Sequence, residues 1–432
     1  MRNIKDVMVV GFALFAMFFG AGNLIFPPFL GLVSGSSWLT GFAGFVLADV
    51  GLALLAILAA ARCNGEVSKV LSRSGKNLSV ILGCAIMICL GPLLAIPRTA
   101  ATTFEMGIMP LFEGFNPVIF SIIFFVLTLM LTIKPSKVVD IIGSFLTPTL
   151  LIALAILIIS GILNPLGEIS TTPMIENVFV EGINQGYQTM DTLGAVALST
   201  VVIATISNKG YKDDKLKVKL TLQAGIVASI ALCLVYGGLA YLGATVSTKY
   251  GADIVQTSLI VNITSMLLGK PGKIILAVIV GLACLTTSVG LTSATGQYFT
   301  KLTNGKLRYE IIVTVVCIFS AIVSNFGVST IIQFSAPILS LIYPATVTLI
   351  VLTLFGNKIN NDNVFKFATY AALIVSMLTV ANDFNISIPF VLKLPFASFG
   401  FNWIVPVTIA GFIGKFIPDK KIENQYRINK SM

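Results

Sequence analysis

The chain has 432 residues, of which 56% are hydrophobic and only 11% are charged. Its mean hydropathy is +0.96, and a soluble protein of this length would need far more polar surface, so the composition excludes one. The formal net charge of +10 does not indicate nucleic-acid binding, because nearly all basic residues lie in alternate loops between apolar segments. The composition therefore predicts an all-α polytopic membrane protein.

Twelve apolar segments of about 20 residues predict twelve transmembrane helices. They lie near residues 7–32, 38–61, 78–104, 117–133, 138–162, 178–206, 218–245, 273–300, 309–326, 329–355, 364–381 and 400–417. A connection containing Pro, Gly and Thr, Gly161–Glu176, separates two blocks of comparable length. We expect one membrane domain over 1–432, with a first repeat at about 6–162, a second at about 176–355, and two extra helices at about 364–417.

The first apolar segment is interrupted by two glycines, an asparagine and two prolines between Gly20 and Pro28. Glycine permits non-helical dihedral angles and proline removes an amide donor, so an unbroken helix is not expected here. Irregular backbone persists within a membrane only where protein buries it or where it lines a watery cavity. The segment therefore predicts a discontinuous helix that binds a ligand near the middle of the membrane.

The second and third segments carry ionisable residues, which are costly at membrane depth and often functional. Arg98 and Glu105 are seven residues apart, so they share one helical face, with Thr102 between them. Arg98 is a candidate for holding a substrate carboxylate or for pairing with a carboxylate as a gate. The alternative is a structural ion pair with Glu105. Asp49 is either a buried structural partner or a proton site.

The sixth segment is interrupted like the first, by a polar stretch between Phe179 and Ala195 that includes Thr189 and Asp191. Two interrupted segments that open successive halves of a chain are typical of secondary transporters built from inverted repeats. Asp191 is interpreted as a functional group in the binding site or as a helix cap that satisfies freed amides. The two roles are compatible.

The eighth segment is rich in hydroxyl groups, with Thr286–Ser288 followed by Thr292–Thr295. Hydroxyl and carbonyl oxygens suit a small alkali cation, as in the ion sites of transporters. The alternative is helix packing, because Ser and Thr in membrane helices bond to backbone carbonyls and permit close helix approach. The neighbouring interrupted helices favour the cation site.

The distribution of basic residues predicts that both termini are cytoplasmic. The opposite loops carry only Lys249, Lys270, Lys273 and Lys393. The chain has no Walker-type phosphate loop, so ATP hydrolysis is not expected. It has no histidine, which excludes a histidine relay or histidine-bound zinc, and no nucleophile motif indicates an enzyme. A channel is less consistent with two interrupted helices.

Three stretches, Met17–Gly31, Leu94–Ala101 and Tyr187–Asp191, resemble the bacterial branched-chain amino acid:cation symporter (LIVCS) family, and the likeness extends over essentially the whole chain. The resemblance implies the leucine-transporter-type fold of the APC superfamily, with two inverted five-helix repeats, discontinuous helices 1 and 6, and two C-terminal helices. It also implies uptake of leucine, isoleucine and valine across the bacterial cytoplasmic membrane, driven by a sodium or proton gradient.

Sodium symporters of that fold have a Gly-x-Gly-Asn…Phe-Pro stretch in helix 1, to which Gly20–Pro27 is similar, and Ala-x-Leu-Thr-Ser in helix 8, to which Ala283–Thr287 is similar. The resemblance implies a sodium site made by carbonyl groups of Ala16, Phe19 and Ala283 and hydroxyl groups of Thr286 and Thr287. It assigns to the substrate Phe18, Ala21, Gly22, Asn23, Ala101, Gln188, Thr189, Met190 and Asp191.

Within that set, the amides of Ala21 and Gly22 would receive the substrate carboxylate, because a half-helix N-terminus offers unpaired amides and a positive dipole end. Carbonyl groups near Phe18 and Gln188, with Thr189, would receive the ammonium group. The branched side chain would lie against apolar side chains of the set.

Two departures from the pattern bear on the coupling ion. Asp191 stands where the sodium symporters usually have a neutral hydroxyl residue, so it is a candidate for neutralising the substrate amine or a second ion. The seventh segment lacks an asparagine for a second sodium site, and Gln223 is a poor substitute. Proton-coupled relatives tend to have a basic side chain in the fifth helix, and residues 138–162 contain none, which favours sodium.

The main prediction is a sodium-coupled importer of branched-chain amino acids, whose partners are the amino acid, the cation and the lipid bilayer. No further cofactor and no nucleic acid is expected. The alternatives are a proton-coupled importer that uses Asp191, Glu105 or Asp49, and a transporter-derived sensor or channel.

Overall fold

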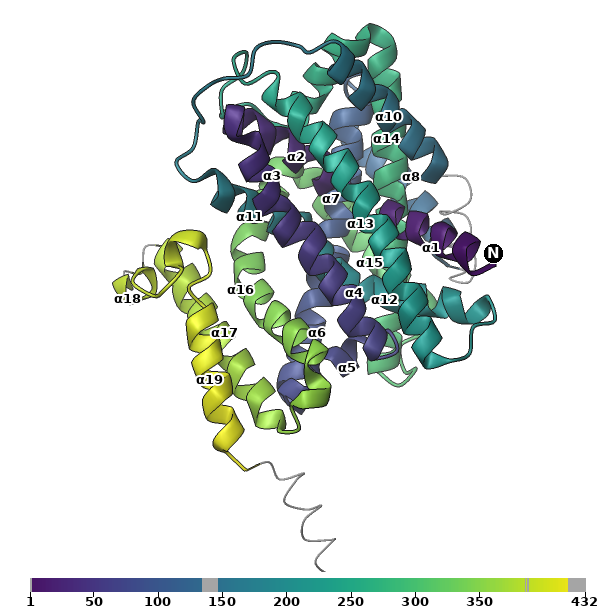
Figure 1. Ribbon diagram of the computed structural model, residues 1–432. Helices are drawn as coiled ribbons and strands as arrows, with labels where there is room; N and C mark the ends of the chain where they lie inside the picture. The colour runs from purple at the N-terminus through teal and green to yellow at the C-terminus, as the bar shows by residue number, and fades with distance from the viewer. Residues whose placement is uncertain (1, 134–146, 385, 387, 419–432) are drawn as a thin grey trace, which may run out of the picture.

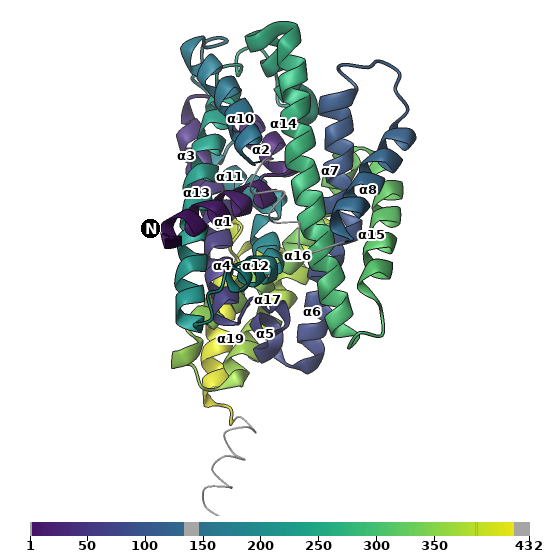
Figure 2. The same ribbon diagram turned by 90° about the vertical axis from the view of Figure 1, so that its right-hand side faces the viewer.

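The computed structural model describes residues 2–133, 147–384, 386 and 388–418. All regular secondary structure in these residues is helical, and the long helices form a bundle (Figure 1 and Figure 2). The helices are α1 (Arg2–Phe18), α2 (Ala21–Ser34), α3 (Trp38–Val46), α4 (Leu52–Arg62), α5 (Val67–Leu71), α6 (Lys76–Ile88), α7 (Ala95–Thr103), α8 (Pro117–Thr132), α10 (Thr147–Leu163), α11 (Val178–Thr189), α12 (Asp191–Asn208), α13 (Asp214–Ala244), α14 (Gln256–Leu302), α15 (Tyr309–Val323), α16 (Val328–Leu354), α17 (Asp362–Asp383), α18 (Pro389–Leu392) and α19 (Ile404–Phe416).

Eight helical segments of the described chain are long and apolar enough to cross a bilayer. They are Ala21–Arg62, Lys76–Ile108, Val178–Asn208, Asp214–Ala244, Gln256–Leu302, Tyr309–Phe326, Val328–Leu354 and Asp362–Asp383. Three shorter apolar helices, α8, α10 and α19, accompany them. The predicted fifth segment, 138–162, begins outside the described residues, and its described part lies in α10.

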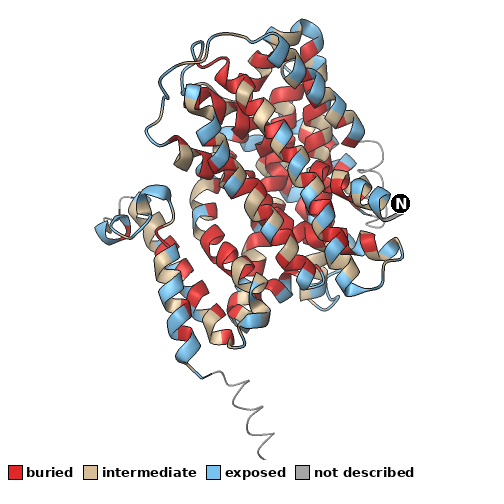
Figure 3. Cartoon of the chain, in the orientation of Figure 1, coloured by how far each residue is buried: buried red, intermediate tan, exposed pale blue. Residues whose placement is uncertain are grey.

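Buried residues concentrate in the centre of the bundle, and exposed residues lie on the outer faces of the helices (Figure 3). The outer faces carry large apolar side chains, including Ile152, Ile230 and Leu234, each more than half exposed. A soluble monomer rarely exposes so much apolar surface, whereas lipid tails accommodate it. The surface chemistry therefore agrees with a polytopic membrane protein.

The first predicted interruption is present but shorter than expected. Helix α1 ends at Phe18 and α2 begins at Ala21, so the break is confined to Phe19 and Gly20. Pro27 and Pro28, which were expected to extend the break, lie inside α2. The shorter break has a local cause, because the Asn23 side chain accepts a hydrogen bond from the Gly20 amide at 3.0 Å and caps the new helix.

The second interruption is a single residue, Met190, between α11 and α12. Met190 has φ 68° and ψ 12°, the left-handed conformation that costs a non-glycine residue about 1–2 kcal/mol. Its side chain is buried, so the surrounding packing holds the residue in this conformation. Backbone strain of this kind is concentrated at functional sites.

Helices α2 and α13 approach each other closely enough to require glycine. A Cβ atom on Gly31 would lie 1.8 Å from the Ala240 carbonyl oxygen, and one on Gly243 would lie 1.8 Å from the Pro28 carbonyl oxygen. Real Cβ atoms do not approach so closely. The second half of the broken first helix is therefore fixed against α13, which brings the first break near the side chains of α13.

Candidate functional site

The side chain of Asn23, which follows the first break, makes the polar contact with the second break. Its carbonyl oxygen caps α2, and its amide nitrogen donates to an Asp191 carboxylate oxygen at 2.8 Å and to the Tyr236 hydroxyl. The Tyr236 hydroxyl in turn donates to the same Asp191 oxygen at 3.3 Å. Asn23 and Asp191 are 1% and 6% exposed, so this network joins the breaks in a nearly water-free region.

A second carboxylate lies beside this network, on the α3–α4 segment. Asp49 belongs to a π-helical stretch, Leu47–Gly51, and is fully buried. One of its oxygens is 2.7 Å from the Thr189 hydroxyl, and the other has no hydrogen-bond partner. The same hydroxyl is 2.6 Å from the Gly186 carbonyl oxygen. Since Thr189 carries one hydroxyl proton, it donates to one of these acceptors at a time.

Arg98 belongs to α7, and its side chain contacts the C-terminal end of α11. Its two terminal nitrogens donate to the carbonyl oxygens of Gln188 at 2.8 Å and Thr189 at 3.3 Å, and its guanidinium lies 5.5 Å from the centre of the Phe26 ring. The side chain is 2% exposed. A cation is favourable at this position, because the last carbonyl groups of a helix carry a partial negative charge.

The structure does not bring Arg98 and Glu105 together. Glu105 accepts hydrogen bonds from the Thr257 hydroxyl at 2.9 Å and the Val328 amide at 2.8 Å. No ion pair links it to Arg98 within the part of the chain that the structure describes. The interpretation of the two residues as a structural ion pair is therefore wrong, because Arg98 on α7 and Glu105 in the π-helical stretch that follows α7 each bind polar groups of other helices.

The residues assigned to sodium lie against the end of α1. The Thr286 hydroxyl is 2.8 Å from the Ala16 carbonyl oxygen and 2.9 Å from the Ala283 carbonyl oxygen, so three of the five assigned groups meet at one point. The Thr287 hydroxyl donates to the Met17 carbonyl at 3.0 Å, one residue further along α1. Phe19 is fully buried in the break itself. Threonine hydroxyls also carry acceptor lone pairs, so these oxygens are able to face a cation.

A small cavity of about 20 Å³ lies between the two breaks. Seven of the nine residues assigned to the substrate line it: Phe18, Ala21, Gly22, Asn23, Thr189, Met190 and Asp191. Arg98 and Thr287 line it as well. A cavity of this volume holds about one water molecule, so the breaks are closed tightly around it and an amino acid enters only if the helices separate.

The other two assigned residues lie elsewhere. Ala101 lines a separate cavity of about 350 Å³ together with Glu105. The Gln188 side-chain oxygen accepts a hydrogen bond from Ser335 on α16 at 3.0 Å, and its backbone carbonyl is bound to Arg98. An ammonium group at that carbonyl would therefore meet a guanidinium of the same sign.

Sequence reasoning missed Tyr236, which lies in the middle of α13 and is fully buried. For that segment it considered Gln223, which the structure places on the exposed surface. A useful signal was present, because a tyrosine inside a long apolar helix needs a partner for its hydroxyl group when it is buried. Ser335 was missed as well, and a single serine in an apolar helix gives no comparable signal.

Known proteins resemble this chain over nearly its full length. A family model described as "Branched-chain amino acid transport protein" matches residues 3–421. The branched-chain amino acid permease BraB of Bacillus subtilis is 36% identical over 426 residues, covering 95% of each chain. The branched-chain amino acid transport system 2 carrier protein of Pseudomonas aeruginosa is 37% identical over 421 residues, covering 95% of this chain and 96% of the relative.

Solved transporter structures share the fold at low sequence identity. Mhp1, a nucleobase-cation-symport-1 family transporter, has a TM-score of 0.62 at 12% identity and covers 94% of this chain and 91% of its own. MhsT, solved in complex with L-phenylalanine, has a TM-score of 0.56 at 17% identity and covers 94% of this chain and 98% of its own. These similarities establish a leucine-transporter-like fold.

Proposed function

Because the chain belongs to the family of branched-chain amino acid transport proteins, we propose that it is a symporter that imports leucine, isoleucine and valine with sodium by alternating access. Membership of this family makes it a transporter rather than an enzyme. The observation that carries the proposal is the contact between the two helix breaks, where Asn23 bonds to Asp191 at 2.8 Å. Thr287 lines the same cavity as these two residues, and Thr286 and Thr287 both bond to the end of α1. Helix breaks that meet in the core of such a fold are where secondary transporters bind substrate and ion.

In this proposal the substrate carboxylate binds at the N-terminus of α2, at the amides of Ala21 and Gly22. Both residues line the small cavity, and a helix N-terminus favours an anion. The ammonium group binds at Asp191 rather than at the Gln188 carbonyl, because Arg98 already donates to that carbonyl. Met190 and Phe18 then lie beside the branched side chain, where each buried methylene contributes about 0.8 kcal/mol.

Sodium binds in the proposal between α1 and α14, with ligands from Ala16, Phe19, Ala283, Thr286 and Thr287. The support is geometric, since Thr286 lies within 2.9 Å of the carbonyl oxygens of Ala16 and Ala283. The C-terminal end of α1 adds the negative end of a helix dipole. Cation binding there stabilises the C-terminal end of α1, where Phe18 lines the small cavity proposed for the substrate.

Proton coupling is the second candidate, and one observation favours it. Asp49 and Asp191 are both buried. The Asp49 carboxylate accepts a hydrogen bond from the Thr189 hydroxyl, which in turn accepts one from the Asp191 backbone amide, and the other Asp49 oxygen lacks a hydrogen-bond partner. A buried unpaired carboxylate is costly unless it binds a cation or a proton. A proton that moves on and off this pair during each cycle would couple transport to the proton gradient. Glu105 is the less suitable site, because both of its oxygens have donors.

The proposal includes the complete architecture. Twelve helices cross the bacterial cytoplasmic membrane, ten of them form two inverted five-helix repeats in which helices 1 and 6 are discontinuous, and two follow at the C-terminal end. Both termini are cytoplasmic. Similar breaks open the two halves, at Gly20 and at Met190, which supports the repeat. Labelling of single cysteines introduced in alternate loops would report the sidedness of each loop.

Uptake of radiolabelled leucine into proteoliposomes tests the function. We expect accumulation under an imposed inward sodium gradient with no pH difference, and little uptake under a proton gradient without sodium. Uptake under the proton gradient alone would show that the coupling ion is the proton and not sodium, with Asp49 and Asp191 as the coupling pair. No accumulation under either gradient would overturn the symporter proposal in favour of a sensor or a channel.

A further inference from the structure

A large cavity outside the candidate site lies between α16, α17 and α19. It has a volume of about 840 Å³, and in Figure 1 α17 and α19 stand beside the main bundle next to α16. Much of its wall consists of apolar or small residues, among them Val347, Val351, Val364, Ala368, Val407 and Gly411. We call this cavity the C-terminal crevice. None of the residues assigned to substrate or ion lines it.

The C-terminal crevice is long and has two chemically different ends. Trp403 lines one end and Lys415 lines the other, and the twelve helical steps from Trp403 to Lys415 correspond to about 18 Å. This length is close to the roughly 15 Å of one hydrocarbon leaflet. An apolar space of this size in contact with lipid is filled by acyl chains, because an empty one would forfeit dispersion contacts.

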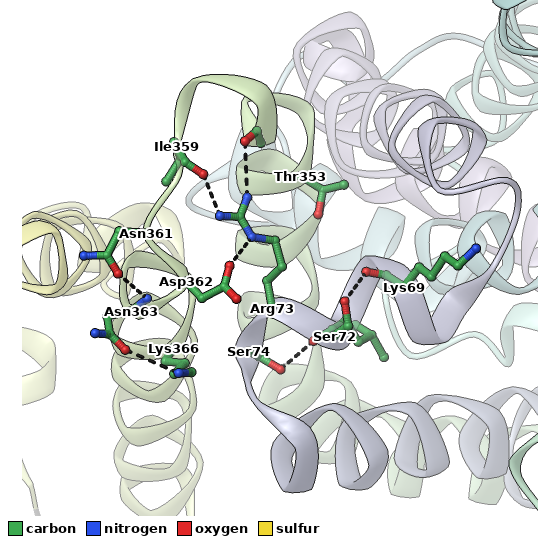
Figure 4. Close-up of polar contacts among 12 residues, drawn as sticks. Lys69, Ser72, Arg73, Ser74, Thr353, Ile359, Asn361, Asp362, Asn363 and Lys366 are labelled. Carbon is green, nitrogen blue, oxygen red and sulfur yellow. Dashed lines mark hydrogen bonds and ion pairs between the residues drawn. The ribbon is translucent and has the colours of Figure 1, made fainter. Parts of the chain in front are cut away.

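The polar end of the crevice carries two lysines. Lys358 and Lys415 both line it and are exposed, and neither has an ion-pair partner in the part of the chain that the structure describes. The neighbouring acid, Asp362, is already paired with Arg73 at 2.6 Å (Figure 4). Among the described residues that line the crevice, these two lysines are the only charged ones, and no carboxylate lines it with them.

The polar end is also held in a fixed shape. Arg73 donates to the Ile359 carbonyl at 2.5 Å (Figure 4), and its guanidinium lies 3.8 Å from the centre of the Phe365 ring. On the other side, the Asn361 amide donates to the Ile417 carbonyl at 2.8 Å and so ties the start of α17 to the end of α19. The segments that carry the two lysines are thus positioned before any ligand arrives, which lowers the entropic cost of binding.

We propose that the C-terminal crevice binds one anionic phospholipid of the cytoplasmic leaflet. An acyl chain lies between α16 and α19, and the headgroup phosphate lies between Lys358 and Lys415. Basic pockets between membrane helices on the cytoplasmic side recognise anionic headgroups in this way. Each lysine near a membrane surface changes affinity by roughly fivefold, so the pair favours an anionic over a zwitterionic lipid by up to about 30-fold.

The chain allows a direct measurement, because it contains only two tryptophans, Trp38 and Trp403. The substitution Trp38→Phe leaves Trp403, at the end of the crevice, as the only fluorophore of its kind. The full-length protein is reconstituted with phosphatidylcholine that contains increasing fractions of brominated phosphatidylglycerol or brominated phosphatidylcholine. We expect half-maximal quenching of Trp403 at a roughly 10- to 30-fold lower fraction of the brominated phosphatidylglycerol.

Charge variants in the Trp38→Phe background separate a specific site from general attraction to the bilayer. The pair Lys358→Gln and Lys415→Gln removes the proposed phosphate contacts and is expected to make the two lipids equivalent. The control pair Lys215→Gln and Lys306→Gln removes the same charge from exposed positions away from the crevice and is expected to retain the preference. Equal loss in both pairs would overturn the proposal.

Two further outcomes would also overturn it. Equal quenching by both lipids in the protein with both lysines intact would mean that the crevice holds bulk lipid without headgroup recognition. An absence of quenching together with a dimer mass in native mass spectrometry would mean that a second copy of the chain fills the crevice. Neither result depends on leucine or sodium, so the test is independent of the proposed symport.

Discussion

Replacement of Asp191 by asparagine isolates the negative charge at the second helix break. One Asp191 oxygen accepts hydrogen bonds from the Asn23 amide at 2.8 Å and from the Tyr236 hydroxyl at 3.3 Å. The side-chain oxygen of an asparagine can accept both, so the contacts that join the breaks are retained. The variant therefore keeps the shape of the site and loses only the charge that we assign to the substrate ammonium group.

The magnitude follows from the difference between two kinds of hydrogen bond. A hydrogen bond to a charged group contributes about 1.5–3 kcal/mol, and one between neutral groups contributes about 0.5–1.5 kcal/mol. The loss in Asp191→Asn is therefore roughly 1–1.5 kcal/mol, which corresponds to a rise in the Kd for leucine of about 5- to 12-fold. Asp49 retains its contact with the Thr189 hydroxyl in the variant.

Equilibrium binding of radiolabelled leucine to the purified protein, at saturating sodium and constant pH, measures this change. The matched control is Asp214→Asn, which removes an exposed carboxylate at the start of α13 and is expected to leave the Kd unchanged. A Kd for Asp191→Asn within twofold of the unmodified protein would refute the assignment of Asp191 to the ammonium group. A loss of pH dependence in uptake, with the leucine Kd unchanged, would instead identify Asp191 as a proton site.

Three further changes probe the ion site, the helix packing and an exposed ion pair. Thr286→Ala removes a proposed sodium ligand and is expected to raise the half-saturating sodium concentration about tenfold or more; the control Thr369→Ala removes an equally buried hydroxyl in α17, and an equal rise there would refute the site. Gly243→Ala places a Cβ atom 1.8 Å from the Pro28 carbonyl oxygen and is expected to lower Tm by several degrees, at a cost of about 1–3 kcal/mol. Gly281→Ala, with no atom within 4 Å, is expected to leave Tm equal or higher, and the reverse order would contradict the packing. A hydrogen bond from Lys301, at 2.8 Å, lowers the pKa of Glu66 from its usual 4.5. A carboxyl group whose pKa is lowered in the folded protein stabilises the fold at pH values above its pKa in the unfolded chain, and this stabilisation is lost as the pH falls through the lowered pKa. The small Tm deficit of Glu66→Gln at pH 7 is therefore expected to disappear on acidification, and a deficit that grows would contradict this sign.

The sequence located both helix breaks, because asparagine and aspartate are rare within apolar membrane segments and here stand beside glycines that permit non-helical backbone. It did not predict how short the first break is. The prolines suggested an interruption as far as Pro28, but α2 re-forms at Ala21 because the Asn23 side chain binds the Gly20 amide. That capping contact depends on a rotamer of one side chain, which composition and spacing do not specify.

Contacts between distant segments were the least predictable part of the site. Helical spacing placed Arg98 and Glu105 on one face, yet Arg98 turns to carbonyl groups of α11 and Glu105 to the amide of Val328. These partners belong to other helices, and their positions depend on how the bundle packs. For the same reason the role of Tyr236 became visible only when α13 was placed against α2 through Gly31 and Gly243.

The network around Asn23 also has a consequence for how the protein is made. The two partners of its amide, Asp191 and Tyr236, lie 168 and 213 residues further along the chain. At a synthesis rate of about 5–20 residues per second, the first segment waits roughly 10–40 s for the seventh to emerge. For most of that interval its polar amide has neither partner, because Asp191 emerges only shortly before Tyr236. The complete network around Asn23 therefore forms only after the seventh segment has entered the membrane.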